Sequence, residues 1–247
     1  MSVEITRLNN GIHVITHHMP HLETAALGIW VKAGARDERA EENGVAHFLE
    51  HMAFKGTPRR SARAIAEEIE SAGGEINAAT GMETTTYYAR VLKQDWALAL
   101  DILADIFTSP ELDEEELERE RDVILQEIAA AHDQPDDLVF DLFNDAAYPH
   151  QPIGRPILGT PERVASFDAP ALRAYLGQHY GTPNAVVAAS GALEHQRRGG
   201  RGQPRGGEAP GARGGRRRAL RRGVGLPDPD AAAAAAEAAA ASRASCR

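Results

Sequence analysis

The sequence has almost no cysteine and no long apolar run. Its only cysteine is Cys246, so a disulfide framework or a thiolate metal site is excluded. No stretch is long and apolar enough to cross a bilayer, and the N-terminus lacks a basic segment followed by an apolar run. These absences predict a soluble protein of a reducing compartment, most simply the cytoplasm.

The first 195 residues also lack a basic stripe. The chain carries a net charge of −9, although residues 196–247 contain twelve arginines and only four acidic residues. The first 195 residues therefore carry −17. An acidic body of this kind argues against nucleic-acid binding by that part of the chain, and no specific nucleic-acid partner is expected.

Strand and helix patterns alternate along the first 195 residues. β-Branched and alternating segments predict strands, and apolar residues at helical spacing predict helices. The expected strands are residues 4–8, 12–16, 25–32, 75–79, 83–92 and 185–189. The expected helices are residues 44–55, 61–72, 96–107, 113–131, 136–147 and 169–180. Because the strands are joined by hairpins and helices without a strict strand–helix–strand repeat, we expect an α+β fold. Its sheet should be mixed, largely antiparallel and covered by helices.

One stretch carries a pattern typical of metal binding. His47 and His51 are four residues apart, and in a helix they would project from one face and could hold one metal ion. Glu50 lies beside them, which gives H-x-x-E-H, the inverse of the H-E-x-x-H pattern. Phe48 and Leu49 point elsewhere and can anchor the helix in a core.

Three further histidines, His17, His18 and His21, also lie close together in the sequence. They could suggest a second metal cluster. Pro20 breaks any regular spacing, so we favour a strand end and a loop for this segment.

A third protein ligand is needed if a catalytic zinc is to keep an open fourth position. The helix expected from Asp113 provides candidates, because Glu120 and Glu127 share its inward stripe with Leu117, Ile124 and Ala131. Carboxylates on an apolar stripe are costly to bury unless they are paired or bound to a metal. An exposed helix edge, or neutralisation by neighbouring arginines, is the alternative. Together with His47 and His51, the metal interpretation is favoured.

These residues together resemble the pitrilysin family of zinc metallopeptidases (inverzincins), and most closely its bacterial members that are similar to mitochondrial processing peptidase. The resemblance covers about residues 3–195. The segments that carry it are residues 43–57, 74–78, 86–88, 120–128 and 154–159.

The resemblance implies a site and an activity. It implies one Zn²⁺ per chain held by His47, His51 and Glu127, with Glu50 as general base and Glu120 as a supporting carboxylate. The implied activity is that of a metalloendopeptidase, which hydrolyses peptide bonds in extended or unfolded peptides with a zinc-activated water.

The resemblance also implies a substrate-binding segment. Asn77 and Ala78 match an edge strand that holds the substrate backbone by strand addition. The expected partners are therefore a peptide or unfolded protein, and a second homologous half-domain or subunit. No membrane partner is expected.

Family members normally contain two related halves, of which the second closes over the first. Residues 1–195 are expected to be the N-terminal catalytic half only, truncated near the end, because the helix expected after the strand near Ser190 is missing. The alternative function is a catalytically silent fragment or subunit that binds zinc and peptide or a partner.

The composition changes abruptly after His195. Residues 196–225 are rich in Arg, Gly and Pro, and residues 231–241 are all alanine except Glu237. We interpret residues 196–247 as the product of a shifted reading frame or a gene-model error, which an intact frame on resequencing would contradict. A disordered basic extension is the alternative. Ten arginines between positions 197 and 222 could then bind polyanions nonspecifically.

Overall fold

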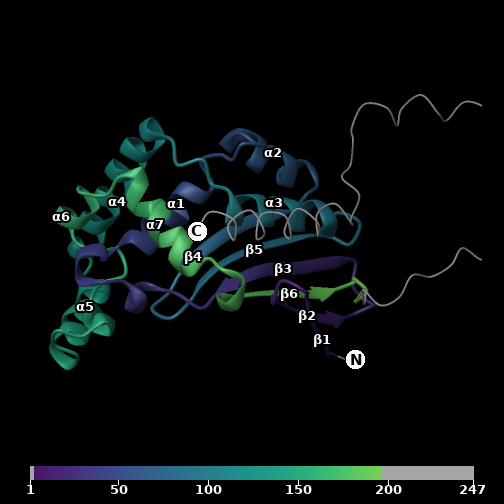
Figure 1. Ribbon diagram of the computed structural model, residues 1–247, viewed down its shortest axis with the longest axis horizontal. Helices are drawn as coiled ribbons and strands as arrows, with labels where there is room; N and C mark the ends of the chain where they lie inside the picture. The colour runs from purple at the N-terminus through teal and green to yellow at the C-terminus, as the bar shows by residue number, and fades with distance from the viewer. Residues whose placement is uncertain (1–2, 196–247) are drawn as a thin grey trace, which may run out of the picture.

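The computed structural model describes residues 3–195 (Figure 1). The predicted low-complexity tail, residues 196–247, lies outside the described residues, so its interpretation and the domain boundary at residue 195 stay predictions.

A single six-stranded sheet forms the centre of the fold. Its strands follow the order β1-β2-β6-β3-β5-β4. They are β1 Val3–Arg7, β2 His13–His18, β3 Thr24–Val31, β4 Glu75–Thr80, β5 Thr85–Leu92 and β6 Ala185–Gly191. Among these described strands, β2 and β6 form the parallel pair, and every other neighbouring pair is antiparallel. The predicted mixed, largely antiparallel sheet is confirmed.

The helices divide into two groups. In Figure 1, α2 and α3 lie along one face of the sheet, whereas α1 and α4 to α7 gather at one end of it. The α-helices are α1 Val45–Ala53, α2 Ala62–Ser71, α3 Trp96–Thr108, α4 Glu114–Asp133, α5 Pro135–Ala147, α6 Pro161–Val164 and α7 Ala169–His179. Short 3₁₀ turns are η1 Ala35–Asp37, η2 Ala40–Glu42, η3 Pro152–Gly154 and η4 Thr182–Asn184. Among the described residues, no helix has the length and apolarity that a membrane span needs.

Local sequence signals explain where several helices start. The Ser61 hydroxyl accepts a hydrogen bond from Ala64 N at 3.2 Å, which caps α2. The Asp113 carboxylate accepts hydrogen bonds from the amides of Glu115 and Glu116, which caps α4. These side chains satisfy amides that have no partner within the first turn of a helix. The predicted helices therefore begin within a residue or two of the observed ones.

Helix α3 differs from its predicted apolar stripe. Leu103 and Phe107 are buried as expected, but Trp96 and Leu100 are only half-buried. Ala99, Ile102 and Ile106 take the remaining apolar core positions of this helix.

Two buried aspartates on α3 anchor the segment that follows α1. Asp101 and Asp105 are 2% and 4% exposed. Arg60 donates to Asp101 at 2.6 Å and to Asp105 at 2.9 Å, and Thr57 also donates to Asp105 at 2.9 Å. The C-terminal end of α1 is thereby tied to α3.

The candidate site lies where α1 meets two other elements. Helix α1 packs against α4 and against β4, which is an edge strand of the sheet. Side chains from a helix pair and from a free strand edge therefore converge at this place.

Candidate metal centre

Helix α1 carries both histidines of the H-x-x-E-H motif. Phe48, Leu49 and Met52 are fully buried and fix the helix in the core, as the sequence predicts for the first two. His47 and His51 are on the opposite side, only partly buried, with their ring centroids 4.7 Å apart. The four-residue spacing therefore places both imidazoles on one accessible face, as predicted.

Helix α4 supplies the facing carboxylates. Leu117, Glu120, Ile124 and Ile128 are its buried residues, and the Glu127 side chain is 42% exposed. Leu117, Glu120 and Ile124 of the predicted inward stripe are therefore buried, whereas Glu127 and Ala131 are only half-buried and Ile128 takes the next buried position. Glu127 can thus reach the histidines while it remains open to solvent.

Three donor atoms converge between α1 and α4. His47 Nε2 lies 3.7 Å and His51 Nε2 lies 3.5 Å from Glu127 Oε2. One atom from each of the three residues lies within 4.8 Å of the others. Ligands about 2.0–2.2 Å from a tetrahedral zinc lie about 3.4 Å apart. The donor set therefore fits one zinc ion with little movement.

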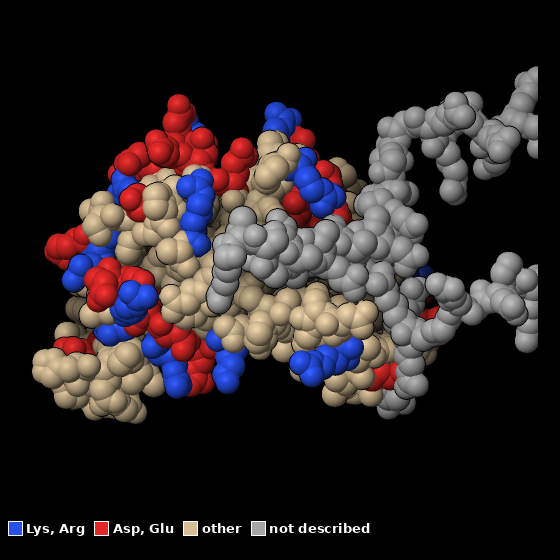
Figure 2. All heavy atoms as spheres, in the orientation of Figure 1, with Lys and Arg blue, Asp and Glu red and all other residues tan. Residues whose placement is uncertain are grey.

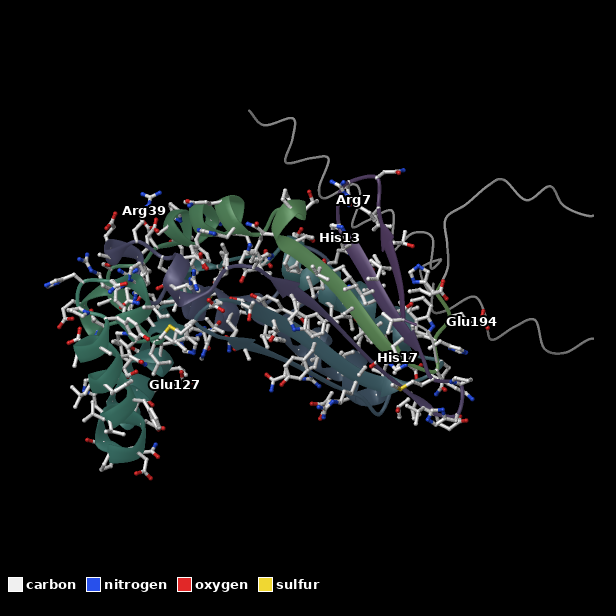
Figure 3. All side chains as sticks on the ribbon, turned by 90° about the horizontal axis from the view of Figure 1, so that it is seen from below. Arg7, His13, His17, Arg39, Glu127 and Glu194 are labelled. Carbon is white, nitrogen blue, oxygen red and sulfur yellow. The ribbon has the colours of Figure 1, made fainter. Side chains whose placement is uncertain are left out.

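Among residues 3–195, no other group of three or more His, Cys, Asp or Glu side chains converges in this way. Figure 3 shows His13 and His17 at the end of the molecule away from Glu127. The N-terminal histidines therefore do not extend this site.

The protonation state of His47 suits a metal ligand. Burial, and secondarily the charge of His51, lower the pKa of His47 to about 4. The imidazole is then neutral near pH 7, and its lone pair is free to bind a cation.

Glu120 supports the second histidine from behind. Its Oε2 lies 3.0 Å from His51 Nδ1, and its Oε1 lies 2.6 Å from Lys55 Nζ. Burial opposes ionisation of Glu120, but the hydrogen bonds from Lys55 and His51 outweigh it and lower the pKa. An ionised Glu120 keeps the His51 proton on Nδ1 and leaves Nε2 for a metal. Sequence reasoning missed Lys55, although it follows His51 by four residues.

Glu50 is beside the donor set but outside it. The Thr80 hydroxyl donates a hydrogen bond to Glu50 Oε2, and the Thr80 backbone amide also bonds this carboxylate. Burial raises the pKa of Glu50 above its ordinary value of 4.5, against the effects of Thr80 and His51. Such a carboxylate is a better proton acceptor than an exposed one. Sequence reasoning gave Thr80 no role, and we find no pattern that singles it out.

Asn77 and Ala78 lie on β4, the strand that borders the site. Gly81 N donates to Thr84 O at 2.8 Å, and hydrogen-bonded and non-bonded pairs alternate from this turn along β4 and β5. The Ala78 amide consequently faces the open edge of the sheet, where it donates to Asn77 Oδ1 at 2.8 Å.

Comparisons with known proteins identify the family of this chain. The family model described as insulinase (peptidase family M16) matches residues 13–161. The chain therefore belongs to peptidase family M16, the insulinase or pitrilysin family.

Two curated relatives and one solved structure show the same likeness. An uncharacterized zinc protease of Rickettsia felis is 45% identical over 193 residues, 78% of this chain and 47% of that protein. A probable mitochondrial-processing peptidase subunit beta of Arabidopsis thaliana is 46% identical over 192 residues, 78% of this chain and 36% of that protein. A protease structure from Helicobacter pylori superimposes with a TM-score of 0.75 at 25% identity, covering 78% of this chain and 47% of that one.

The match covers most of this chain but only part of each relative. The chain spans about half, or less, of the length of the curated relatives that it matches.

Proposed function

We propose that this chain binds one zinc ion through His47, His51 and Glu127 and hydrolyses peptide bonds in extended or unfolded peptides. The observation that carries the proposal is the convergence of three donor atoms within 4.8 Å. The membership of peptidase family M16 and the relatives named zinc proteases support it.

The donor chemistry is suited to zinc. Two imidazole nitrogens and one carboxylate oxygen are a common ligand set of catalytic zinc sites, which keep a fourth position open. When bound, zinc polarises the scissile carbonyl and makes a water at the site a stronger acid.

Glu50 acts as the general base. Its carboxylate takes a proton from the attacking water as the new C–O bond forms, and it then delivers a proton to the leaving amine as the C–N bond breaks. The hydrogen bond from the Thr80 hydroxyl holds the carboxylate in one orientation. Its raised pKa helps it to hold a proton between the two steps.

The edge of β4 binds the substrate backbone. An extended peptide adds to this edge as a further strand. A carbonyl oxygen of the peptide then replaces Asn77 Oδ1 as the acceptor of the hydrogen bond from the Ala78 amide. Because Thr80 at the end of the same strand bonds Glu50, a peptide paired with β4 runs past the general base. This arrangement selects chains that can become extended.

Peptide cleavage by the full 247-residue chain loaded with zinc tests the proposal. Glu50→Gln keeps the size of the side chain but removes its basicity, so we expect cleavage to fall by at least about 100-fold with the zinc content unchanged. Glu70→Gln, at an exposed position of α2, is the matched control and should cleave normally. Cleavage by Glu50→Gln at the normal rate would contradict the mechanism.

A second candidate function is that of a silent subunit that needs another half-molecule. Helix α5 favours it, because its large apolar side chains point outward: Val139, Phe140, Leu142 and Phe143 are 54–68% exposed. The polar residues Asp141 and Asn144 are half-buried instead. Figure 2 shows an uncharged surface over this helix at the lower left. An exposed apolar helix face of this kind is typical of an interaction site.

The occupant that we propose for this face is the homologous second half, since the chain spans about half of its relatives. A separately produced second half of a relative should raise the cleavage rate of this chain, and Phe143→Ser should weaken that rescue. Ile5→Ser, which changes an equally exposed apolar residue on β1, is the control. Full activity of the isolated chain, unchanged by the added half, would rule out the second candidate.

A further inference from the structure

A buried carboxylate outside the metal centre lies at the start of the metal-binding helix. Glu38 follows η1 and is only 3% exposed. Helix α1 begins after Gly44, which has a φ of +98° and no side chain to cap the helix. The amides of the first turn therefore need acceptors from elsewhere in the chain.

The Glu38 side chain provides these acceptors. Its Oε1 accepts from Ala46 N at 2.9 Å. Its Oε2 accepts from Gly44 N at 2.9 Å and from Asn43 Nδ2 at 3.1 Å. Ala46 directly precedes His47 in the sequence. The carboxylate therefore holds the backbone one residue before the first histidine of the candidate metal centre.

A second segment closes over the same helix start. Arg155 donates a hydrogen bond to the backbone oxygen of Glu38, and Asn43 Nδ2 also donates to Pro156 O at 3.0 Å. The backbones of Gly44 and Gly159 are in close contact, because a Cβ on Gly44 would lie 2.9 Å from Gly159 Cα. The loop of residues 155–159 and the turn before α1 consequently fix the helix start from two sides.

This arrangement bears directly on the metal centre. His47 and His51 must hold their nitrogens within about 0.5 Å of the positions that tetrahedral coordination requires. A small shift of α1 along its axis would move both nitrogens together relative to Glu127 on α4. The core residues of α1 are apolar, and apolar contacts fix such a shift less sharply than hydrogen bonds to the first turn do.

We propose that Glu38 is a positioning residue for the metal centre. Its carboxylate sets the axial position of α1 and thereby aligns His47 and His51 with Glu127. The proposal rests on the zinc site proposed above. It assigns to Glu38 a role in zinc affinity and geometry, beyond its contribution to the stability of the fold.

Zinc affinity of the full chain, measured by competition with a chelator, tests this proposal. Glu38→Gln retains the size of the side chain but replaces one acceptor oxygen with an NH₂ group that faces a donor. We expect Zn²⁺ to bind about 10-fold more weakly, as changes to groups that orient metal ligands do. The visible absorption bands of bound Co²⁺ should shift as well, because they report ligand geometry.

Val91→Ala separates positioning from stability. Val91 is buried near the end of β5, six residues after Thr85, where the strand begins. Its truncation to alanine removes core contacts at a place away from α1 and therefore lowers the stability of the fold. It should leave the Zn²⁺ affinity and the Co²⁺ spectrum unchanged. If Glu38→Gln binds Zn²⁺ as tightly as the wild-type chain, or loses no more affinity than Val91→Ala, the proposal is wrong.

A milder variant covers the case in which Glu38→Gln does not fold. Asn43→Ala removes one hydrogen bond to Glu38 and one to Pro156 but leaves the two backbone bonds intact. We expect a smaller loss of Zn²⁺ affinity, of about 3-fold, and no loss at all would overturn the proposal. A wild-type chain that binds no zinc would instead contradict the proposed function. It would also contradict the proposed role of Glu38, which rests on that function.

Discussion

Glu120 Oε2 lies 3.0 Å from His51 Nδ1, while the other oxygen of the same carboxylate lies 2.6 Å from Lys55 Nζ. The carboxylate is thus bonded on both sides and buried between α1 and α4. It fixes the orientation of a metal-ligand candidate without belonging to the donor set.

Removal of this support should weaken metal binding. Glu120→Ala leaves His51 Nδ1 without its acceptor, so we expect the Kd for Zn²⁺ to rise by about 10- to 100-fold. Chelator competition measures the effect. Glu114→Ala, at an exposed position of the same helix, is the control, and an equal effect of both changes would show that Glu120 has no special role.

Proline substitutions on β4 test the substrate-binding edge. The Ala78 amide faces the open edge, so Ala78→Pro should keep the fold. It should raise the KM for an extended peptide by about 2- to 10-fold, which corresponds to one lost hydrogen bond. Ala79→Pro removes an amide that pairs with β5 and should instead lower the Tm. Steady-state kinetics and thermal unfolding separate the two cases. An unchanged KM for Ala78→Pro would argue against strand addition at β4.

The stability of the chain should depend on pH through Glu38. Burial, opposed by hydrogen bonds from Ala46, Gly44 and Asn43 and by the charge of Arg155, raises the pKa of Glu38 from 4.5 to about 7. On α7, burial raises the pKa of Tyr175, and the neighbouring Tyr180 and Glu38 add to this effect.

Because the folded-state pKa is the higher one, the contribution of Glu38 to stability is present below pH 4.5 and is lost as the pH rises through 7. With metal removed, the unfolding free energy of the wild-type chain should fall relative to Glu38→Gln by on the order of 2 kcal/mol between pH 5 and 8. Urea unfolding at several pH values measures the difference. Parallel pH profiles for both chains would refute the prediction.

The anchor between α3 and the segment after α1 should contribute strongly to stability. Asp101 accepts hydrogen bonds from both Arg59 and Arg60, and these bonds outweigh the effect of burial and lower its pKa. Asp101→Ala leaves Arg60 partly unpaired in a buried place and should destabilise the fold by about 2–3 kcal/mol. The contribution should be lost as the pH falls below 3.8 and through the lowered pKa. Asp122→Ala on the surface of α4 should have little effect in the same unfolding assay.

Much of the fold and of the site follows from local sequence signals. Helical periodicity puts His47 and His51 on one face of α1, and Glu120 and Glu127 on one face of α4. It does not separate Glu127 from Glu120 as the third ligand candidate, and that choice comes from the resemblance to the family.

The same periodicity does not predict the buried face of α3 correctly. Asp101 and Asp105 occupy buried positions there because they pair with Arg60, which is distant in the sequence. Ion pairs across elements leave no periodic pattern.

The remaining parts of the site depend on long-range contacts. Glu38 caps a helix that begins seven residues later, and Thr80 reaches Glu50 from a strand thirty residues away. Nothing in the local sequence of either residue marks these pairings. The location in the cytoplasm, and the roles of the site residues, stay predictions.

Zinc content per chain tests the central claim most directly. Glu127→Ala removes the ligand candidate on α4, and Glu50→Gln alters a neighbour that lies outside the donor set. After dialysis against limiting zinc, the wild-type chain and Glu50→Gln should each retain about one zinc, while Glu127→Ala should retain little. Equal zinc in Glu127→Ala and the wild-type chain, or no zinc in the wild-type chain, would contradict the account.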